Sequence, residues 1–583
     1  MDEMQPSPVL TDLTELEQRV VKTACRGEVA KPATTMTVED LAVTDDPELQ
    51  VRADLFRELL RGLHGDLDPR GVQVEGVRVV GQLDLDQVTA VTGLALHGCA
   101  LPDGVVCREA HLRYLYVDGS LLAYLHADGL RTDGILSMED ATITGFGNLG
   151  AIRLLGAGIG GQLILDGATL TNNTGPALIA DRIHTHSKLS MEHATITGAG
   201  EHGAIRLLGA DIGGQLILDR ATLTNNTGPA LIADHIHTHG DVFMENTTIT
   251  GSGDRGAVRL LGAHISGELS LSPSSITNTA GPALTADFLR TDDSFSIEDA
   301  IITGAGKLGA IRLPAAHIGS QAVLQVSSLA NTSGPLLMLP EAQITGSLLF
   351  PQEVVCSAGG EGTSRRGCPD SDRTITAHGL TYSFLRAISW HQWLHLLVHH
   401  TPTYRPQPFQ QLAATERAAG HDNNAREVLI TQQHELRRRT PEALGNRLAR
   451  GRHALWGWLG CYGYRAHRVV TALAVVLTLA AALSLLAGHV TTHPGHHAAE
   501  RVPPASAKPD APGAPCSPVE LVGLGIDRGL PLGTTGIRAH CDLDTTTGWG
   551  QTFTAALWVL QALLWGLATL AIAAYTGLVR KPT

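Results

Sequence analysis

The sequence has few of the residues that several protein classes require. Of 583 residues, only 4% are aromatic and 17% are charged, and 43 basic residues stand against 57 acidic ones. This composition excludes a disordered polyampholyte, and the absence of a basic surplus argues against a nucleic-acid-binding protein. Eight cysteines are too few for a scaffold held together by disulfides. Glycine, with 64 residues, is the residue in excess, and its positions lead to the fold.

The most informative feature is an internal repeat with a period of 53 residues. The segment GAIRLLGA, with small changes, opens each unit, and the first two units agree at 41 of 53 positions. Residues 162–172 also align with 188–198, so the smallest repeating structural unit is about 25–28 residues long. The units are 150–202, 203–255, 256–308 and, in part, 309–350.

Short alternating strands, separated by glycine, Asn-Asn or Gly-Pro, fill each half unit. Leu163 and Leu165 point to one face, and no stretch of 72–350 carries a sustained helical stripe. Stacking such strands about 4.8 Å apart builds a continuous core. The sequence therefore predicts a mainly β protein with a parallel β-helix (solenoid) over 72–350. A leucine-rich repeat is the main alternative, but its helix or asparagine ladder is missing from the pattern.

Helical patterns flank the predicted solenoid. An N-terminal cap has helical pieces at 13–21 and 51–63, and helices are expected at 381–400 and 407–439. The last segment is broken by Gly-His-Asp and predicts a helical hairpin that resembles one tetratricopeptide unit. The expected division is a cap (1–71), the solenoid (72–350), a helical juxtamembrane region (351–468), a first span (469–487), an outer loop (488–554), a second span (555–579) and a tail (580–583).

Two uncharged apolar runs, 469–487 and 555–579, are long enough to cross a bilayer. Eight arginines and one acidic residue precede the first run within 437–468, and Arg580 and Lys581 follow the second. Because cytoplasmic flanks are rich in Lys and Arg, the pattern predicts a protein of the cell membrane with a cytoplasmic N-terminal region. No N-terminal stretch resembles a signal peptide, which agrees with this orientation.

The predicted orientation also gives an expectation for each cysteine. Cys516 and Cys541 lie in the outer loop and either form a disulfide or remain two thiols. The other six are expected to be free thiols: Cys25, Cys99, Cys107, Cys356, Cys368 and Cys461. Cys356 and Cys368 bracket a Gly/Ser/Arg loop, but two cysteines without further ligands make a poor zinc site.

Several segments outside the repeat units have a distinctive pattern. They are VRADLFRELLRG (51–62), GVRVVGQLDLDQV (76–88), PFQQLAATERAAGHDNNAREVLITQQ (408–433), GCYGYR (460–465) and TGLVRK (576–581). With these segments the chain resembles a family of actinobacterial membrane-anchored repeat proteins, often labelled "membrane-associated oxidoreductase". The resemblance carries over no catalytic residues, and the 53-residue units are more regular here than the family pattern.

Each unit also contains a glycine pattern that matches a dinucleotide-binding fingerprint. Gly145, Gly147 and Gly150 form GxGxxG, and Asp166 follows about twenty residues on, where a ribose-binding acid would sit. The fingerprint has to open a helix whose N-terminus meets the pyrophosphate. Here it opens AIRLLGAGIGGQLILD, which alternates like a strand. We therefore interpret these glycines as solenoid corners and assign no cofactor.

Two histidine pairs are the candidates for a metal site: His184 with His186, and His237 with His239. Each pair lies at i,i+2 on one strand face, roughly 7 Å apart. The equivalent positions in the outer units, 53 residues away, are Arg131 and Asp133, and Arg290 and Asp292. A polar surface ladder tolerates this exchange and a metal site does not, so the pattern favours a ladder and leaves the four histidines as weak metal candidates.

A further histidine group lies at i, i+4 and i+8 on one helix face: His391, His395 and His399. Zinc sites of the HExxH type use such spacing, but the glutamate is absent. We expect this face, with Trp390 and Trp393, to cap the solenoid or to contact lipid headgroups.

Two ladders of opposite charge also follow the repeat. They are Arg153, Arg206, Arg259 and Arg312, and the acids Asp128, Asp181, Asp234 and Asp287. Stacked like charges repel unless they are solvated or paired. The ladders either pair with each other or form a ribbon for a charged partner, and the sequence leaves both open.

These features favour a membrane-tethered scaffold whose solenoid face binds a protein partner. An enzyme is the alternative, either an oxidoreductase, as the family label says, or a carbohydrate-active β-helix. The carboxylates for the latter would come from Asp133, Glu139 and Asp140, or from Asp292, Asp293, Glu298 and Asp299. A third hypothesis is an acidic DNA mimic, because residues 72–350 carry 27 acidic and 14 basic residues.

Overall fold

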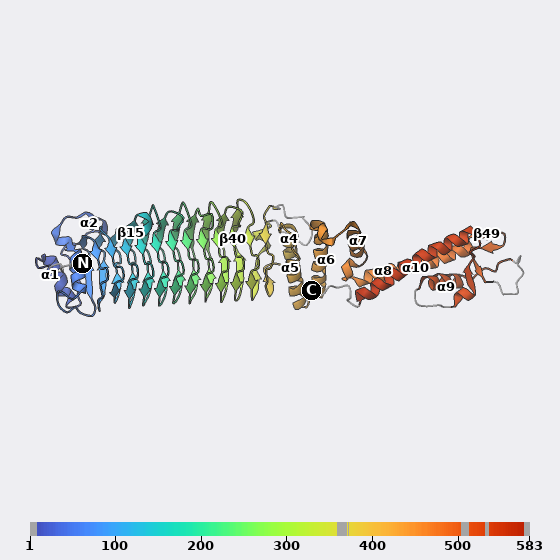
Figure 1. Ribbon diagram of the computed structural model, residues 1–583, viewed down its shortest axis with the longest axis horizontal. Helices are drawn as coiled ribbons and strands as arrows, with labels where there is room; N and C mark the ends of the chain where they lie inside the picture. The colour runs from blue at the N-terminus through green and yellow to red at the C-terminus, as the bar shows by residue number, and fades with distance from the viewer. Residues whose placement is uncertain (1–8, 358–369, 371, 503–511, 531–535, 576–583) are drawn as a thin grey trace, which may run out of the picture. The chain divides into compact units, whose positions relative to one another are not determined.

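The computed structural model describes residues 9–357, 370, 372–502, 512–530 and 536–575. The chain divides into two compact units, Met1–His421 and Asp422–Thr583. The first unit contains the solenoid with short helices at both ends, and the second contains the long apolar helices (Figure 1). Each unit is described separately below.

Four parallel sheets, here called A to D, form the faces of the solenoid (Figure 1). They contain 14, 12, 12 and 10 strands, and each full turn adds one short strand to each sheet. This confirms the predicted parallel β-solenoid. Their outermost strands are β1 (Val29–Ala30) and β48 (Phe384–Arg386) in sheet A, β2 (Gln50–Arg52) and β43 (Ser328–Asn331) in B, β5 (Leu83–Asp84) and β47 (Ile375–Thr376) in C, and β9 (His111–Leu112) and β45 (Gln343–Ile344) in D.

Stacked apolar side chains form the core of the solenoid and explain the repeat period. In sheet A, Leu189 of β22 (Leu189–Ser190) pairs with Leu163 of the preceding turn and Leu216 of the following turn, and all three are buried. These intervals are 26 and 27 residues, which add up to 53. One sequence repeat is therefore two turns, because only every second turn has the same kind of corner.

The two kinds of corner differ at the end of the sheet B strand. There, Gly145, Gly198, Gly251 and Gly304 alternate in register with Asn172, Asn225, Asn278 and Asn331. The Asn225 amide is fully buried; it donates to the carbonyls of Gly200 (3.0 Å) and Pro229 (2.7 Å) and accepts from the N–H of Thr227 (3.0 Å). An asparagine ladder is thus present, contrary to the sequence interpretation, and it lies in a β-solenoid.

The glycine pattern that matches the dinucleotide fingerprint lies at the other kind of corner. Gly145 ends β15 (Thr142–Gly145), and a Cβ on it would lie 2.4 Å from the Cα of Ala151. Gly150 has φ +90°, a backbone conformation that residues other than glycine rarely adopt. The chain then enters β16 (Ile152–Arg153), which is a strand and not a helix. The glycines therefore serve the corner, as expected.

Both ends of the solenoid extend beyond the expected limits of 72–350. At the start, β1 and β2 join sheets A and B between the helices α1 (Glu15–Ala24), α2 (Val38–Val43) and α3 (Ala53–Leu60). At the end, β47 and β48 add a further partial turn. The prediction of a helix over 381–400 is therefore wrong for its first part, because the helix begins only at Trp390.

The helix α4 (Trp390–His399) closes the C-terminal end of the solenoid. Its Trp393 is buried edge-on against Phe350 and Tyr382, with ring centroids 5.9 and 6.0 Å away. Of the two roles that the sequence left open for this helix, its buried side chains Trp393 and His395 fit capping. The following helix, α5 (Gln407–Ala418), ends before the expected break at Gly-His-Asp.

The second unit contains two helices that are long and apolar enough to cross a membrane by length and composition, 467–489 and 548–573. They lie within α8 and α10. The first covers the expected span 469–487, and the second begins before the expected start at 555; residues 576–579 of that expected span and the tail 580–583 lie outside the described residues. The helices of this unit are α6 (Asp422–Arg439), α7 (Arg447–Gly460), α8 (Ala466–His489), α9 (Pro518–Gly529) and α10 (Gly548–Tyr575). Cys516 and Cys541 form a disulfide that joins the start of α9 to β52 (Cys541–Leu543).

Candidate functional site

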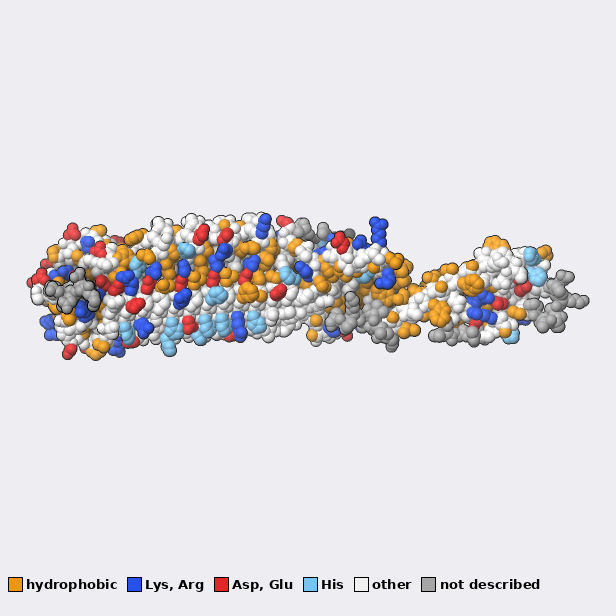
Figure 2. All heavy atoms as spheres, viewed as in Figure 1, with side chains coloured by type: hydrophobic (Ala, Val, Ile, Leu, Met, Phe, Trp, Pro, Cys, Tyr) orange, Lys and Arg blue, Asp and Glu red, His pale blue; other side chains and the backbone are white. Residues whose placement is uncertain are grey.

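Histidine side chains form a row along the solenoid (Figure 2), and the strand pairing places histidines at successive outward positions of sheet D. The second residue of each two-residue strand points into the core, so the first residue and the one after the strand point outward. We call this face the histidine stripe. Its histidines are His111, His184, His186, His237, His239, His264 and His317, and the carboxylates between them are Asp133, Asp211 and Asp292.

Asp211 is the centre of the stripe. Its carboxylate accepts from Nδ1 of His184 at 3.0 Å and Nε2 of His239 at 3.2 Å, and Nδ1 of His237 lies 3.7 Å away. His237 also stacks on His264, with ring centroids 4.8 Å apart and planes 7° from parallel. The contacts thus run between turns, whereas the sequence grouped the histidines within single strands.

The sequence reasoning missed Asp211 and His264, although a signal for both existed. They occupy the same position of successive repeat units, where the first unit has Gly158 and the fourth has His317. His186 is exposed, and none of the polar contacts described for the stripe involves it. Of the four weak metal candidates, only His237 and His239 lie close enough to share an ion with Asp211, their ligand atoms being within 4.8 Å of one another.

The surroundings of His237 disfavour the charged form of its imidazole. Burial lowers the pKa of His237, and the neighbouring His239 and His264 lower it further, against the opposite effect of Asp211 and Asp292. A hydrogen bond from Arg290 lowers the pKa of Asp292, so this carboxylate stays ionised. The lowered pKa of His237 beside the lowered pKa of Asp292 favours an uncharged imidazole next to an ionised carboxylate.

The two charged ladders pair with each other on sheet C. Each arginine contacts the aspartate of the preceding turn: Arg153 with Asp128 (2.7 Å), Arg206 with Asp181 (2.7 Å), Arg259 with Asp234, and Arg312 with Asp287 (2.6 Å). The acids are largely buried apart from Asp128, whose side chain is 28% exposed. This decides between the two interpretations that the sequence left open: the ladders are ion pairs within the solenoid.

The carboxylates considered for a carbohydrate-active enzyme belong to different faces. Asp133 contacts His111 (2.9 Å) and Asp292 contacts His264 (3.1 Å), both on sheet D. Glu298 ends β38 (Phe295–Glu298) in sheet A, and Asp299, like Asp140, lies at the following corner with positive φ. Asp293 and Glu298 raise the pKa of Glu268, after the larger effect of its burial.

The helix face with His391, His395 and His399 does not act as one surface. His391 is exposed, but His395 is fully buried beside His400 and Cys356, so lipid-headgroup contact is excluded for His395. Cys356 is disulfide-bonded, and the expectation that it is a free thiol is therefore wrong. Cys368 lies outside the described residues. Cys25, Cys99, Cys107 and Cys461 are free thiols, as expected.

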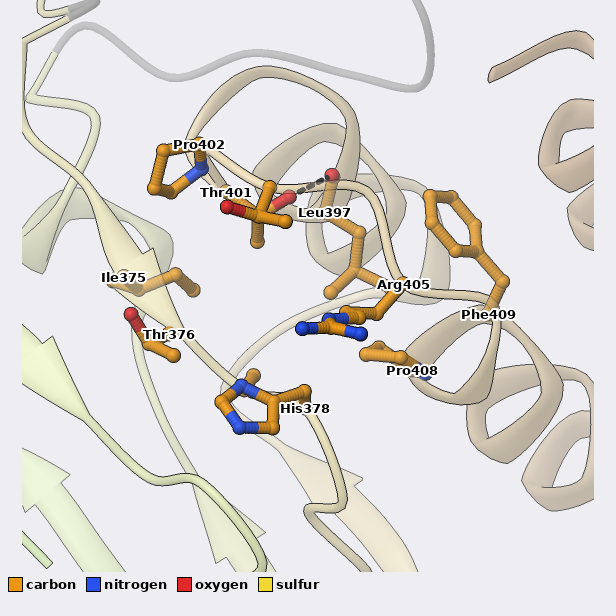
Figure 3. Close-up of a pocket in the computed structure, with 11 residues that line it drawn as sticks. Ile375, Thr376, His378, Leu397, Thr401, Pro402, Arg405, Pro408 and Phe409 are labelled. Carbon is orange, nitrogen blue, oxygen red and sulfur yellow. Dashed lines mark hydrogen bonds between the residues drawn. The ribbon is translucent and has the colours of Figure 1, made fainter. Parts of the chain in front are cut away.

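A cavity between β47 and the helices α4 and α5 has a volume of about 120 Å³ (Figure 3). Ile375, Leu397, Pro408 and Phe409 line it, and the hydroxyl of Thr401 donates to the carbonyl of Leu397 (2.6 Å). Pockets for small molecules usually measure about 300–1,000 Å³. This cavity is thus too small for a nucleotide or a sugar chain.

Comparisons with protein-family models, with curated proteins and with solved structures gave no match. The resemblance to the actinobacterial membrane-anchored family therefore stays a prediction. The assignment of function depends on the geometry of this chain alone.

Proposed function

We propose that the protein is a membrane-tethered scaffold that binds a protein partner along the histidine stripe. The observation that supports this proposal is the register of sheet D. It stacks outward polar side chains along a sheet of ten strands, interrupted at β17 (Gly158–Ile159), whose outward positions are glycines. Repeat proteins commonly use such long, regular faces to bind partners. A near-copy of a unit lengthens this face without disturbing the rest, which fits a binding role better than a catalytic cleft.

The tether consists of α8 and α10, and the N-terminal unit faces the cytoplasm. The arginines of 437–468 and Arg580 and Lys581 support this orientation, because basic residues gather on the cytoplasmic side. On α7, Leu448, Leu455 and Trp458 are strongly exposed among arginines. Such a combination suits the boundary between lipid and water.

Two alternative functions have less support. An acidic DNA mimic needs unpaired carboxylates that imitate phosphates, whereas the aspartates of sheet C are paired with arginines. A carbohydrate-active enzyme needs two carboxylates on one substrate. Here Asp292 follows β37 (Arg290–Thr291) of sheet D, whereas Glu298 ends β38 of sheet A.

Thiol labelling in intact cells tests the topology. Cys25 is exposed and free, so a membrane-impermeant maleimide should label it only after permeabilisation. The variant His493→Cys places an exposed thiol between the spans, and it should react without permeabilisation. Cys25→Ser is the control for background labelling. Labelling of Cys25 in intact cells contradicts the cytoplasmic orientation.

Photo-cross-linking in the native membrane tests the binding face. A photoreactive residue at His186 or His317 should give an adduct, and one at Thr222, exposed on sheet B, should not. The captured protein is then purified, and its affinity is measured for the chain carrying His186→Ser, His239→Ser and His317→Ser. We expect a loss of about tenfold or more. Equal affinity of the wild type and this variant contradicts the proposal.

A further inference from the structure

Three metal-binding groups meet beneath the last turn of the solenoid. Cys356 follows the short helix η3 (Gln352–Val354), His395 lies on α4, and His400 directly follows α4. Their ligand atoms all lie within 4.8 Å of one another. Cys356 and His395 are fully buried, and His400 is 1% exposed. This cluster differs from the partly exposed group around Asp211 because all of its members are removed from water.

The donor set and its spacing suit a zinc ion. Zinc binds thiolate at about 2.3 Å and imidazole at about 2.0–2.1 Å in a tetrahedron, which places neighbouring ligand atoms about 3.4–3.6 Å apart. Ligand atoms that lie within 4.8 Å of one another have to approach by at most about 1.4 Å to reach this spacing. Nδ1 of His400 donates to the carbonyl of Arg373 at 2.7 Å, which places the lone pair of the neutral ring on Nε2. Metal-binding histidines commonly have such a second hydrogen bond, which fixes the tautomer.

The disulfide of Cys356 bears on when such a site could form. If α8 and α10 cross the membrane, as proposed above, residues 1–466 and 490–547 face opposite sides. The disulfide Cys516–Cys541 and that of Cys356 are then on opposite sides too. Disulfides persist on the oxidising side and are rare in the cytoplasm. With the N-terminal unit in the cytoplasm, the disulfide of Cys356 is the one that meets reducing conditions.

We propose that Cys356, His395 and His400 bind Zn²⁺ when the Cys356 sulfur is reduced. A cellular dithiol supplies two electrons and two protons to the disulfide, which becomes two thiols, and the dithiol itself becomes a disulfide. Zn²⁺ then replaces the proton of the Cys356 thiol, and this proton passes to water. In either redox state Cys356 is bonded, to another sulfur or to the metal.

The effect of the metal is to fix α4 onto the end of the solenoid. Cys356 follows β46 (Ser347–Leu349) and the short helix η3, whereas His395 lies on α4 and His400 directly follows α4. A zinc ion therefore joins two parts of the chain that are 39 residues apart in sequence. Because ligand exchange is tied to the redox state, the cap gains a metal in reducing surroundings and loses it on oxidation.

Metal analysis of the purified full-length chain in detergent tests the proposal. The protein is reduced with a phosphine, loaded with Zn²⁺ alone and passed over a chelating resin. We expect about one retained Zn²⁺ per chain that is absent without reduction. The exposed group around Asp211 is removed from the count by repeating the measurement in Asp211→Asn, which should retain the same amount.

Loading with Co²⁺ in place of Zn²⁺ identifies the ligands by spectroscopy. A thiolate ligand gives a charge-transfer band that imidazoles and carboxylates do not give. The band should appear in the reduced wild type and in the controls Cys461→Ser and His391→Asn, and it should vanish in Cys356→Ser. Cys356→Ser exchanges a single atom, sulfur for oxygen, so the test does not depend on variants of the buried histidines, which could fail to fold. Absence of the band in the reduced wild type, or its persistence in Cys356→Ser, overturns the proposal whatever the topology of the chain.

Discussion

The N-terminal and central parts of the solenoid differ in the length of a turn. Leu94, Leu115 and Leu136 stack in sheet A at intervals of 21 residues, whereas later turns take 26 or 27. Both parts use the same four sheets in the same register. The solenoid therefore admits two turn lengths without changing its core.

The extra residues all enter between sheets B and C. The first paired residues of the two strands are Leu121 and Leu125 in a short turn, four residues apart, but Thr169 and Leu178 in a long turn, nine apart. The other three connections keep their lengths, because sheets A, C and D stay paired with the turn before. The length of a turn therefore varies only at the corner between sheets B and C. The backbone N–H and C=O groups of the added residues need hydrogen-bond partners there, and the buried asparagines supply some of them.

The largest effect should come from removing one of these asparagines. Asn225→Ala leaves the carbonyls of Gly200 and Pro229 and the N–H of Thr227 without their partner, which we expect to cost about 3 kcal/mol. Hydrogen exchange of the full chain should rise in the long turns around 195–232 and stay unchanged in the short turns. The exposed neighbour Asn226→Ala is the matched control. Equal protection in both variants contradicts a supporting role for the ladder.

A smaller loss is expected from filling the alternate corner. In Gly198→Ala, the new Cβ would lie 2.5 Å from the Cα of Ala204, and the backbone has to move. We expect a cost of about 2 kcal/mol. Gly158→Ala, whose Cβ would meet nothing within 4 Å, should be neutral in the same thermal denaturation. Similar melting temperatures for both variants show that the long corner is not tightly packed.

The ion pairs of sheet C should differ in strength along the solenoid. Arg259→Met leaves Asp234 without its ion-pair partner, and the side chain of Asp234 is only 10% exposed. Arg153→Met does the same to the more exposed Asp128, at the entry to the long turns. Because an unpaired charge costs more where water is excluded, Arg259→Met should destabilise by about 1 kcal/mol more. Chemical denaturation of both variants measures this difference, and an inverted order refutes it.

The smallest effect concerns proton binding at the stripe. Asp211→Asn removes a charge that raises the pKa of His237, so this pKa should fall further. His126, whose pKa is lowered by burial in the short-turn part, is the internal control and should not change. Exchange of the imidazole C2 proton against pH, followed by mass spectrometry, gives both midpoints. An unchanged His237 midpoint shows that Asp211 does not act on it.

The sign of the pH effect on stability follows from the same shift. The folded chain binds a proton at His237 more weakly than the unfolded chain, whose histidines titrate near pH 6.5. This group therefore costs no stability at neutral pH and destabilises the fold as the pH falls below about 6.5.

The fold was largely predictable because its signal is local and repeated. Alternating leucines such as Leu163 and Leu165 mark the core positions of each turn, and the repeat multiplies this signal. The helix expected from residue 381 was wrong because β46 has a free edge that recruits Phe384–Arg386 as a strand. Helix propensity was overridden by this pairing, which the sequence pattern does not reveal.

The candidate site was less predictable because its contacts cross between turns. Asp211 meets His237 and His239 only because strands 26 residues apart stack in register, and a shift by one residue would turn these side chains to the other face. Arg206 and Asp181 are brought together in the same way.

The sequence by itself determined a stacked β architecture, its period and two apolar helices, because apolar spacing and run length are properties of short segments. Only the tertiary structure decided which polar groups meet: the paired ladders, the cluster at Asp211, and Cys356 beside His395 and His400. The physical reason is that hydrogen bonds, ion pairs and metal ligation act over a few ångströms. Which groups become partners depends on how the turns stack and on how α4 packs against the C-terminal end of the solenoid.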